Sequence, residues 1–411
     1  MIILVVRISG HRPLHNMFET LLHLGMVATA FMFIPGGDLR EIKMIAALIF
    51  AMSLISVEFY TRGISKFNNK WFLILLAYIP VSVMLAPNPA ITLIGIDVSH
   101  FWCWEPMLYI LIFSLMIMSI ASHEFKREDV YRLLRTMVYC GAFTATYMVL
   151  QFFMIDQWFE PISSFINGRG HVAGFIGNPT LTSPFVAMII PIALYLKRHI
   201  LALIMIISVF LTDSQMGYGA MIVSLIFYFS MFGAKRFVLC GLTMVVLSAS
   251  LILVWNNQAT KNFINPNERF FHWKQIAIDI KSPLSEEIKT SYPITGRGLG
   301  SFKYVYHVEH PGGETTPNRF QQAHNDYLEF AYSCGLAGLA LLLAAIFTMF
   351  KNNFSVYEIF KGNFDRRTAA LLASFSCIAM CAFGTFAWQI GTTIFYSALL
   401  VGLLHNETLG D

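Results

Sequence analysis

The chain has 411 residues, of which 56% are hydrophobic, 15% aromatic and only 13% charged. A soluble domain carries about 25% charged residues, so this composition excludes an ordinary soluble enzyme. The formal net charge of +4 is small, which makes the placement of Lys and Arg along the chain more informative than their number.

Apolar runs long enough to cross a bilayer, about 17 to 25 residues each, recur along nearly the whole chain. They predict an all-α polytopic membrane protein with about twelve transmembrane helices in a single transmembrane domain, 1–411. Two pairs of short helices, 199–211 with 219–233 and 368–384 with 386–404, could also be re-entrant or tilted. In chain order the predicted helices cover residues 17–35, 42–59, 71–86, 106–122, 137–155, 182–196, 199–211, 219–233, 237–255, 327–350, 368–384 and 386–404.

The cationic residues are distributed unevenly between alternate loops. With the N-terminus inside, most of them lie in the cytoplasm, whereas the short loops on the other side hold only Arg40, Lys43 and Arg169. This asymmetry predicts an inner (cytoplasmic) membrane protein with both termini in the cytoplasm. Arg7 interrupts the first apolar run, so no cleaved targeting segment is expected. The cytoplasmic set is Arg7, Arg12, Arg62, Lys66, Lys70, Lys126, Arg127, Arg132, Arg135, Lys197, Arg198, Lys235, Arg236, Lys351, Lys361, Arg366 and Arg367.

One long loop, 256–326, separates the ninth and tenth predicted helices and is predicted to form a large periplasmic loop subdomain. Long translocated loops escape the charge rule, so the cations in this loop do not contradict the orientation. Within it, residues 273–280 can form an amphipathic helix and residues 296–300 a glycine-rich turn. The glycines are a poor signal for dinucleotide binding, because no strand precedes them and no helix with an acidic partner follows.

Three polar clusters fall on the predicted outer face, where burying polar groups beside hydrocarbon is costly and usually serves a function. Arginine can hold phosphate oxygens with two parallel hydrogen bonds, and a histidine kept neutral among cations can accept a proton from a hydroxyl. If the clusters converge on one cavity, they suit glycosyl or phosphoryl transfer from a lipid diphosphate. In chain order the clusters are Arg169, His171, Asn178 and Pro179; Arg269, His272 and Trp273; and residues 321–329, which include His324 and Asn325.

Five short motifs follow one another between residues 168 and 341. They are Arg169 with Gly174-Phe175-Ile176-Gly177-Asn178-Pro179 and Pro191; Asp213-Ser214; Arg269-x3-Trp273; Gly296-Arg297-Gly298-x-Gly300-Ser301-Phe302; and Ala323-His324-Asn325-x-Tyr327-Leu328-Glu329 with Gly335-Leu336-x-Gly338. Each motif is weak alone. Their order, spacing and topology together resemble the bacterial O-antigen ligase and O-antigen polymerase superfamily, multi-spanning glycosyltransferases of the GT-C type.

The resemblance implies transfer of a glycan from undecaprenyl diphosphate to a sugar hydroxyl, such as one on lipid A-core, at the periplasmic face. It implies neither a metal nor a cofactor. His324 would be the base or the group that orients the acceptor, and Arg169 and Arg269 would bind the diphosphate. The supporting residues would be Asn325, Trp273 and Asn178.

The sequence departs from this family after the seventh helix. The family usually has Ser-Arg-Gly there, whereas this chain reads Ser214-Gln215-Met216-Gly217. Gln215 can donate hydrogen bonds to a phosphate but cannot neutralise it. Either another cation such as Arg297 or Arg319 supplies the missing charge, or the donor binds differently, or the protein is impaired.

Two other functions remain open at this point. A polymerase would use the same donor but add it to another lipid-linked repeat unit, and no feature of the sequence separates the two. A transporter or flippase would need charges near the bilayer midplane, often in repeated halves, and the sequence has neither. Membrane lipids are expected partners in each case, and nucleic acid is not.

Several other polar residues are expected to have structural roles. His307 and His310 have a metal-like spacing, but no carboxylate or cysteine pattern completes a site. The six cysteines include no CxxC pair, so neither a disulfide framework nor a thiolate site is expected. Glu19 and Glu58 lie near helix ends and are expected at the surface. Asp326 and Glu329 are expected to cap the tenth helix or to orient His324.

Overall fold

A computed structural model of the chain describes residues 12–32, 39–61, 67, 69–86, 107–153, 172–236, 238, 239, 242, 267–281, 293–300, 302 and 323–406. At 12, 13, 39–41, 107, 108, 267–271 and 281 it describes the backbone alone. Over this part of the chain the fold is all-α and contains no strand, as the composition predicted.

The helices follow the apolar runs of the sequence. Each predicted helix has a counterpart except 237–255, which lies outside the described residues apart from a few positions. The amphipathic segment of the long loop is also helical, as α13. The elements are α1 (Arg12–Phe31), α2 (Leu39–Thr61), α3 (Lys70–Met84), α5 (Met107–Ser122), α6 (Arg127–Phe152), η1 (Gly174–Ile176), α8 (Pro179–Tyr195), α9 (His199–Leu211), α10 (Gln215–Ser230), α13 (Asn267–Lys281), α15 (Asp326–Asn353), α16 (Val356–Lys361), α17 (Arg366–Cys381), η3 (Ala387–Gln389) and α18 (Gly391–Leu404).

Three of the described helices are long and apolar enough to cross a membrane: Ile42–Thr61, Arg127–Phe152 and Asp326–Asn353. Shorter apolar helices accompany them, among them α8, α9 and α18. Large apolar side chains project from the outer faces of the bundle, such as Ile200, which is 76% exposed, and Phe347, which is 67% exposed. Such faces are unfavourable in water and suit contact with lipid, so the chain is a membrane protein.

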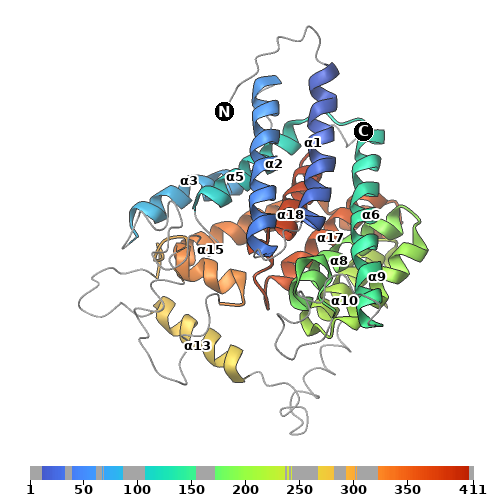
Figure 1. Cartoon of the computed structure of the whole chain (residues 1–411). Coiled ribbons are helices and arrows are strands. Elements are labelled where there is room, and N and C mark those ends of the chain that lie inside the picture. The colour runs from blue at the N-terminus through green and yellow to red at the C-terminus, as the bar shows by residue number, and fades with distance from the viewer. Residues whose placement is uncertain are drawn as a thin grey trace.

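Helix α8 forms the core of one half of the molecule. It is apolar all round, and α6, α9, α10 and α17 pack against it. A helix with no polar face is expected in a buried position. In the other half, α1 and α2 pack together and against α18, while α15 contacts α3 and α13 (Figure 1).

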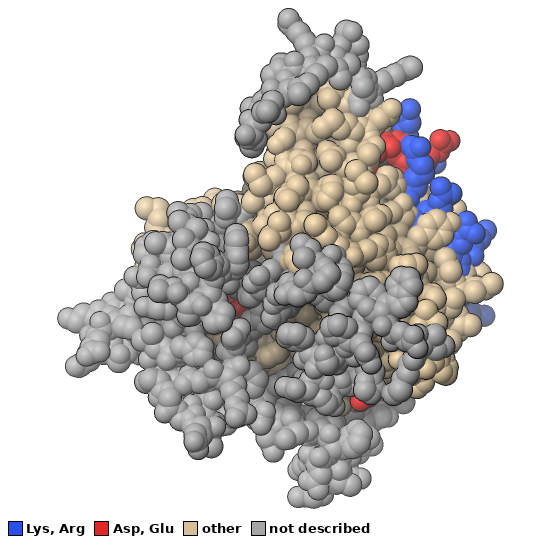
Figure 2. Space-filling view, in the orientation of Figure 1, with Lys and Arg blue, Asp and Glu red and all other residues tan. Residues whose placement is uncertain are grey.

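Cationic side chains mark one end of the molecule. The first turns of α6 carry Arg127, Arg132 and Arg135. In the view of Figure 2, the visible Lys and Arg side chains lie along one edge, on the side where α6 lies in Figure 1, with some Asp or Glu side chains among them. In the sequence-based prediction these arginines lie in a cytoplasmic loop that precedes the helix.

The prediction that Glu19 and Glu58 lie at the surface is wrong. Glu19 is 7% exposed and Glu58 is fully buried. Glu58 is near the end of α2, as expected, whereas Glu19 is about two turns inside α1, because this helix begins at Arg12. Glu19 interacts with His15 and Arg132, and Glu58 interacts with His123. A position near the end of a helix therefore did not imply contact with solvent.

Helix α15 is interrupted by a kink at Gly335, where φ is 71° and ψ is 178°. Only glycine adopts this conformation readily, and it breaks the ladder of hydrogen bonds within the helix. Residues 293–298 of the long loop replace the lost partners: Arg297 N donates to Tyr332 O (3.1 Å) and Leu336 N donates to Pro293 O (2.8 Å). The glycine-rich turn of the loop is thereby fixed against the kinked helix.

Candidate functional site

The candidate site is built around the start of α15. Asn325 has an extended backbone and its side-chain oxygen accepts a hydrogen bond from Leu328 N (3.0 Å), so this residue is the helix N-cap. His324, immediately before the cap, has a φ of 50°. That left-handed conformation is uncommon for a residue with a side chain, and it turns the chain sharply into the helix. The partly buried His324 ring lies 5.2 Å from the ring of Phe386, between centroids.

The two acids that follow are both buried, but they do not cap the helix. Asp326 accepts hydrogen bonds from Trp388 N (2.9 Å) and from Gln389 Nε2 (3.0 Å), which ties α15 to η3. Glu329 accepts a hydrogen bond from Ala323 N (2.8 Å) and so holds the residue before His324. The expected cap is therefore supplied by Asn325. Glu329 binds the backbone beside His324, and its role in orienting the His324 ring stays a prediction.

Helix α13 joins the same segment from the long loop. The indole Nε1 of Trp273 donates a hydrogen bond to Ala323 O (2.8 Å). Further along α13, Ile276 and Ile280 pack with Tyr332 and Phe302 in a small buried cluster. The second and third polar clusters of the sequence are thus adjacent in space, and the backbone beside His324 is held on one side by Glu329 and on the other by Trp273.

Arg297 is buried, with 1% of its surface exposed. Its Nη2 donates a hydrogen bond to Asp279 O (2.9 Å), and its guanidinium lies 4.3 Å from the centre of the Tyr332 ring. A guanidinium favours this combination of a carbonyl acceptor and an aromatic face. In this conformation Arg297 joins α13 to α15.

The N-terminal ends of α8 and α10 form another side of the same end of the molecule. Asn178 caps α8 through a hydrogen bond from Thr180 N (2.9 Å), and Ser214 caps α10 through one from Gly217 N (3.2 Å). Gln215 is the first residue of α10 and its side chain is exposed. A helix N-terminus with free backbone N–H groups attracts anions.

Close packing links these helix ends to the His324 segment. A side chain at Gly217 would overlap Ser183 of α8, and one at Gly384, just after α17, would overlap Met216 of α10. Gly384 precedes Phe386 by two residues, and Phe386 contacts His324. These contacts connect the first turns of α8 and α10 to the segment after α17, which in turn contacts His324 at the start of α15. Helix α13 joins this region through Trp273, in the middle of that helix.

The two predicted diphosphate binders are not placed. Arg169 lies outside the described residues, as do Arg319 and His171. The backbone of Arg269 belongs to the first turn of α13, one turn before Trp273, but its side chain is outside the described part of the chain. The site as described thus contains His324, Asn325 and Trp273 together, with Asn178 and Gln215 on neighbouring helix ends.

An apolar cleft reaches this region from between the helices. Its lining comes from α2, α3, α5, α15, α17 and α18, together with residues at their ends. Phe72, Leu76 and Phe113 are among its apolar residues, and Asp326 and Trp388 line it as well. The cleft thus connects the site to a long apolar surface.

A match to a known protein family covers this region of the molecule. The O-antigen ligase family model matches residues 200–343, which run from α9 to the second half of α15 and include Trp273, Arg297 and His324. This match supports a place for the chain in the O-antigen ligase and polymerase superfamily. No curated protein matches the chain.

The O-antigen ligase match covers only part of the resemblance seen in the sequence. It begins after Asn178, so residues 168–199 lie outside it, and it ends at 343, close to the expected limit of 341. The family supports a membrane enzyme of the glycosyltransferase type that uses lipid-linked glycan and glycan acceptor substrates.

Sequence reasoning missed the contribution of the segment between α17 and α18 to this candidate site. Phe386, Trp388 and Gln389 contact His324 or Asp326, although they lie more than 60 positions further along the chain. They show no polar cluster or motif, so a single sequence contained no signal for them.

Proposed function

We propose that this protein transfers a glycan from an undecaprenyl-diphosphate donor to a hydroxyl group of an acceptor sugar, as an O-antigen ligase acting on lipid A-core. The observation that carries the proposal is the restrained His324 segment at the start of α15, which lies within the matched residues and is contacted by α13 and by the segment after α17. Residues that are held in an uncommon backbone conformation, as His324 is, cluster at functional sites.

In the proposed reaction, the acceptor hydroxyl oxygen attacks the anomeric carbon of the donor sugar. The bond between that carbon and the diphosphate oxygen breaks, and undecaprenyl diphosphate leaves with the electron pair. His324 accepts the proton of the hydroxyl through one of its ring nitrogens. Proton removal of this kind contributes about 10² to 10⁴ in rate. Stabilisation of the leaving-group charge and alignment of the two substrates would supply the rest.

Arg169 and Arg269 are the proposed binders of the diphosphate. Guanidinium groups hold phosphate oxygens through paired hydrogen bonds and remain charged at any physiological pH. Gln215 would donate a further hydrogen bond from the end of α10, without adding charge. Because the guanidinium of Arg297 is engaged by Asp279 O and Tyr332, we assign it a supporting role and not direct contact with the donor. No metal ion has a part in this mechanism.

The apolar cleft supports a lipid-linked donor. A polyprenyl chain needs a long apolar surface that ends where its diphosphate is bound. The cleft offers apolar side chains along α3, α5 and α15, and Asp326 at its lining is two residues from His324. We propose that the first part of the polyprenyl chain lies in this cleft.

The proposed topology places the site on the periplasmic side. About twelve transmembrane helices, both termini in the cytoplasm and the 256–326 loop outside would put His324, Asn178 and Gln215 at the outer ends of their helices. The chain would form one transmembrane domain in the inner membrane, and the 256–326 loop would be its periplasmic subdomain.

A His324→Ala variant tests the catalytic assignment in cells. We expect glycan transfer to be lost while the protein accumulates in the membrane at the wild-type level. Normal transfer by this variant would contradict the role of His324. A matched variant, His199→Ala, changes an exposed histidine at the start of α9 and should leave transfer intact.

The glycan profile of a deletion strain separates the ligase from the polymerase. Loss of a ligase leaves lipid A-core bare while polymer accumulates on its carrier. Loss of a polymerase leaves single repeat units attached to lipid A-core. The first profile supports the ligase that we propose, and the second would replace it with the polymerase of the same superfamily.

A further inference from the structure

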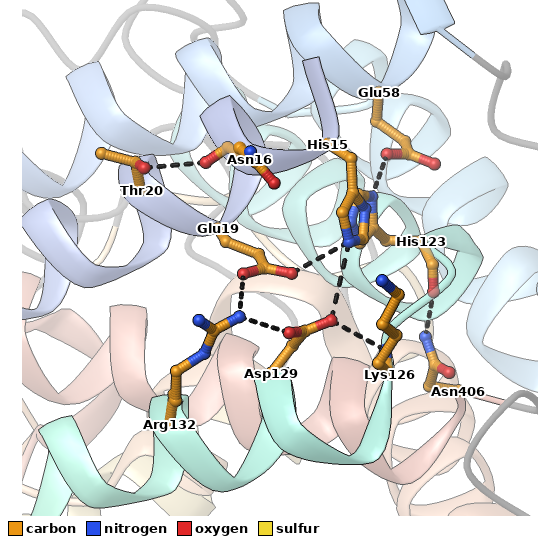
Figure 3. Close-up of polar contacts among 10 residues, drawn as sticks. All are labelled: His15, Asn16, Glu19, Thr20, Glu58, His123, Lys126, Asp129, Arg132 and Asn406. Atoms are coloured by element: carbon orange, nitrogen blue, oxygen red, sulfur yellow. Dashed lines mark hydrogen bonds and ion pairs between the residues drawn. The ribbon is translucent and has the colours of Figure 1, made fainter. Parts of the chain in front are cut away.

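A second polar cluster lies far from the candidate site, between the N-terminal ends of α1 and α6 (Figure 3). His15 and Glu19 are one turn apart on α1 and face the first two turns of α6, where Asp129 and Arg132 lie. We call these four residues the α1–α6 cluster. It includes charged groups that a membrane protein would keep buried only for a reason.

Arg132 contacts one oxygen of each of the two carboxylates. Its Nη2 lies 3.2 Å from Glu19 Oε2 and also binds Asp129 Oδ1. The other oxygen of each carboxylate faces His15: the Nε2 atom of His15 is 3.0 Å from Glu19 Oε1 and 3.6 Å from Asp129 Oδ2. Figure 3 shows these atoms converging from the two helices. One nitrogen and two oxygens therefore surround a common point, all within 4.8 Å of one another.

The ion pairs with Arg132 do not account for this convergence. Glu19 is 7% exposed, and its Oε1 atom has no hydrogen-bond partner among the described residues, although His15 Nε2 is only 3.0 Å away. The two atoms thus lie at contact distance without hydrogen-bond geometry. A buried carboxylate oxygen left in this way is unfavourable unless a cation or a proton satisfies it. Arg132 and Lys126 are the cations that act on Glu19, and Asp129 Oδ2 also accepts a hydrogen bond from Lys126 N (3.0 Å).

Neighbouring residues hold the imidazole of His15 in place. Its ring stacks on His123, with centroids 4.8 Å apart and an interplanar angle of 6°. His123 Nδ1 is 2.7 Å from Glu58 Oε2, and its carbonyl accepts a hydrogen bond from Asn406 Nδ2 (2.6 Å). This stacking fixes the plane of the His15 ring, while His15 Nδ1 has no hydrogen-bond partner among the described residues.

We propose that the α1–α6 cluster binds a divalent transition-metal ion such as Zn²⁺ through His15 Nε2, Glu19 Oε1 and Asp129 Oδ2. Zn²⁺ takes imidazole nitrogen and carboxylate oxygen at about 2.0 to 2.2 Å in tetrahedral sites, which separates neighbouring donor atoms by roughly 3.3 Å. The separations of 3.0 and 3.6 Å are close to that value. Water would complete the coordination. The ion would link α1 to α6 and has no part in glycan transfer.

Metal binding by the purified full-length protein tests this proposal. The protein, in lipid nanodiscs, is stripped with a chelator, dialysed and titrated with Zn²⁺, and bound metal is measured together with the thermal unfolding midpoint. We expect one bound ion per chain and a higher midpoint. The variants His15→Gln and Glu19→Gln each remove one ligand and should weaken binding by at least about 10- to 100-fold.

Asp365→Asn provides a matched control. Asp365 caps α17 through Thr368 N and lies outside the α1–α6 cluster, and asparagine is an equally good cap, so binding should be unchanged. Wild-type protein that binds no Zn²⁺ would overturn the proposal and favour a proton shared by Glu19 and Asp129. Equal binding by wild type and Glu19→Gln would overturn it as well.

A cobalt-substituted wild-type protein gives a readout that needs no variant. Co²⁺ in the proposed site has only nitrogen and oxygen ligands, so its absorption spectrum should lack thiolate charge-transfer bands. Such bands would place the metal on a cysteine and contradict the assignment.

Discussion

Trp273 donates a hydrogen bond through its indole Nε1 to Ala323 O at 2.8 Å, across 50 positions of sequence. The acceptor is the residue before His324, so the long-loop helix α13 directly restrains the proposed catalytic histidine. This contact explains why two motifs that are far apart in the chain belong to one site.

The Trp273→Phe variant should keep most of the packing of this ring and lose the hydrogen bond. A net loss of about 1 kcal/mol is typical of such a bond and corresponds to roughly a five-fold change. We expect kcat/KM for glycan transfer to fall by about that factor in a reconstituted assay, and its pH profile to shift because the His324 segment is less restrained.

Trp71→Phe is the matched control for this change. Trp71 is a partly exposed residue of α3, far from His324 in sequence, and its replacement should leave both the rate and the pH profile unchanged. Wild-type kinetics for Trp273→Phe would mean that the hydrogen bond has no role in positioning the histidine.

The left-handed backbone at His324 allows its side chain and its turn to be tested separately. Asparagine adopts a φ near 50° more easily than most residues but is a poor base. We therefore expect His324→Asn to keep the thermal midpoint of the wild type and to lose about 10² to 10⁴ in transfer rate. Both quantities are measured on purified protein in nanodiscs.

His324→Gly completes this test, since glycine relieves the backbone strain and removes the ring. Its midpoint should be close to that of the wild type, because glycine adopts the left-handed conformation without steric strain. If either variant transfers glycan at the wild-type rate, His324 serves only the turn.

The sequence predicted the positions of the helices well because apolar runs determine them, but it misplaced some ends. Helix α6 begins at Arg127, ten residues before the predicted span. The early turns are charged, yet Val130, Leu133 and Leu134 recur at helical spacing and are buried. A search for continuous apolar character excluded these amphipathic turns, whereas periodicity would have included them.

Contacts between distant segments could not be predicted from one sequence. His324, Asn325 and Trp273 belong to motifs and were identified, whereas the contact of Asp326 with Gln389 spans 63 positions and has no local pattern. The burial of Glu58 depends in the same way on His123, 65 positions away. Side-chain identity indicated which residues need partners, but only the fold shows where the partners are.

Gly335→Ala should destabilise the protein strongly. The φ of 71° at this position is unfavourable for alanine, and its Cβ would overlap the carbonyl oxygen of Ile294. Strain of this kind costs about 1–3 kcal/mol before any steric overlap is counted. We expect a clearly lower thermal midpoint and less protein in the membrane.

Gly219→Ala is the matched control, because Gly219 lies within α10 and a Cβ there meets no atom within 4 Å. Alanine is favoured over glycine inside a helix by about 0.5–1 kcal/mol, so this variant should be as stable as the wild type or more stable. Equal midpoints for the two variants would show that the kink at Gly335 is not required.

His405 should make the stability of the protein depend on pH. Burial lowers the pKa of this histidine below its usual value of 6.5, and its ring stacks on Phe67 at 4.8 Å. The unfolded chain therefore binds the proton more tightly than the folded chain does. Stability is fully present above pH 6.5 and decreases as the pH falls through the lowered pKa, by up to about 1.4 kcal/mol per pH unit.

Thermal unfolding midpoints between pH 8 and about pH 5 measure this effect, and comparison with His405→Leu isolates it from other groups. Leucine cannot be protonated, so the midpoint of this variant should decrease less on acidification than that of the wild type. His199→Leu changes an exposed histidine and should retain the full decrease. The same decrease in the wild type and in His405→Leu would contradict the prediction, because protonation of His405 would then carry no cost in the folded protein.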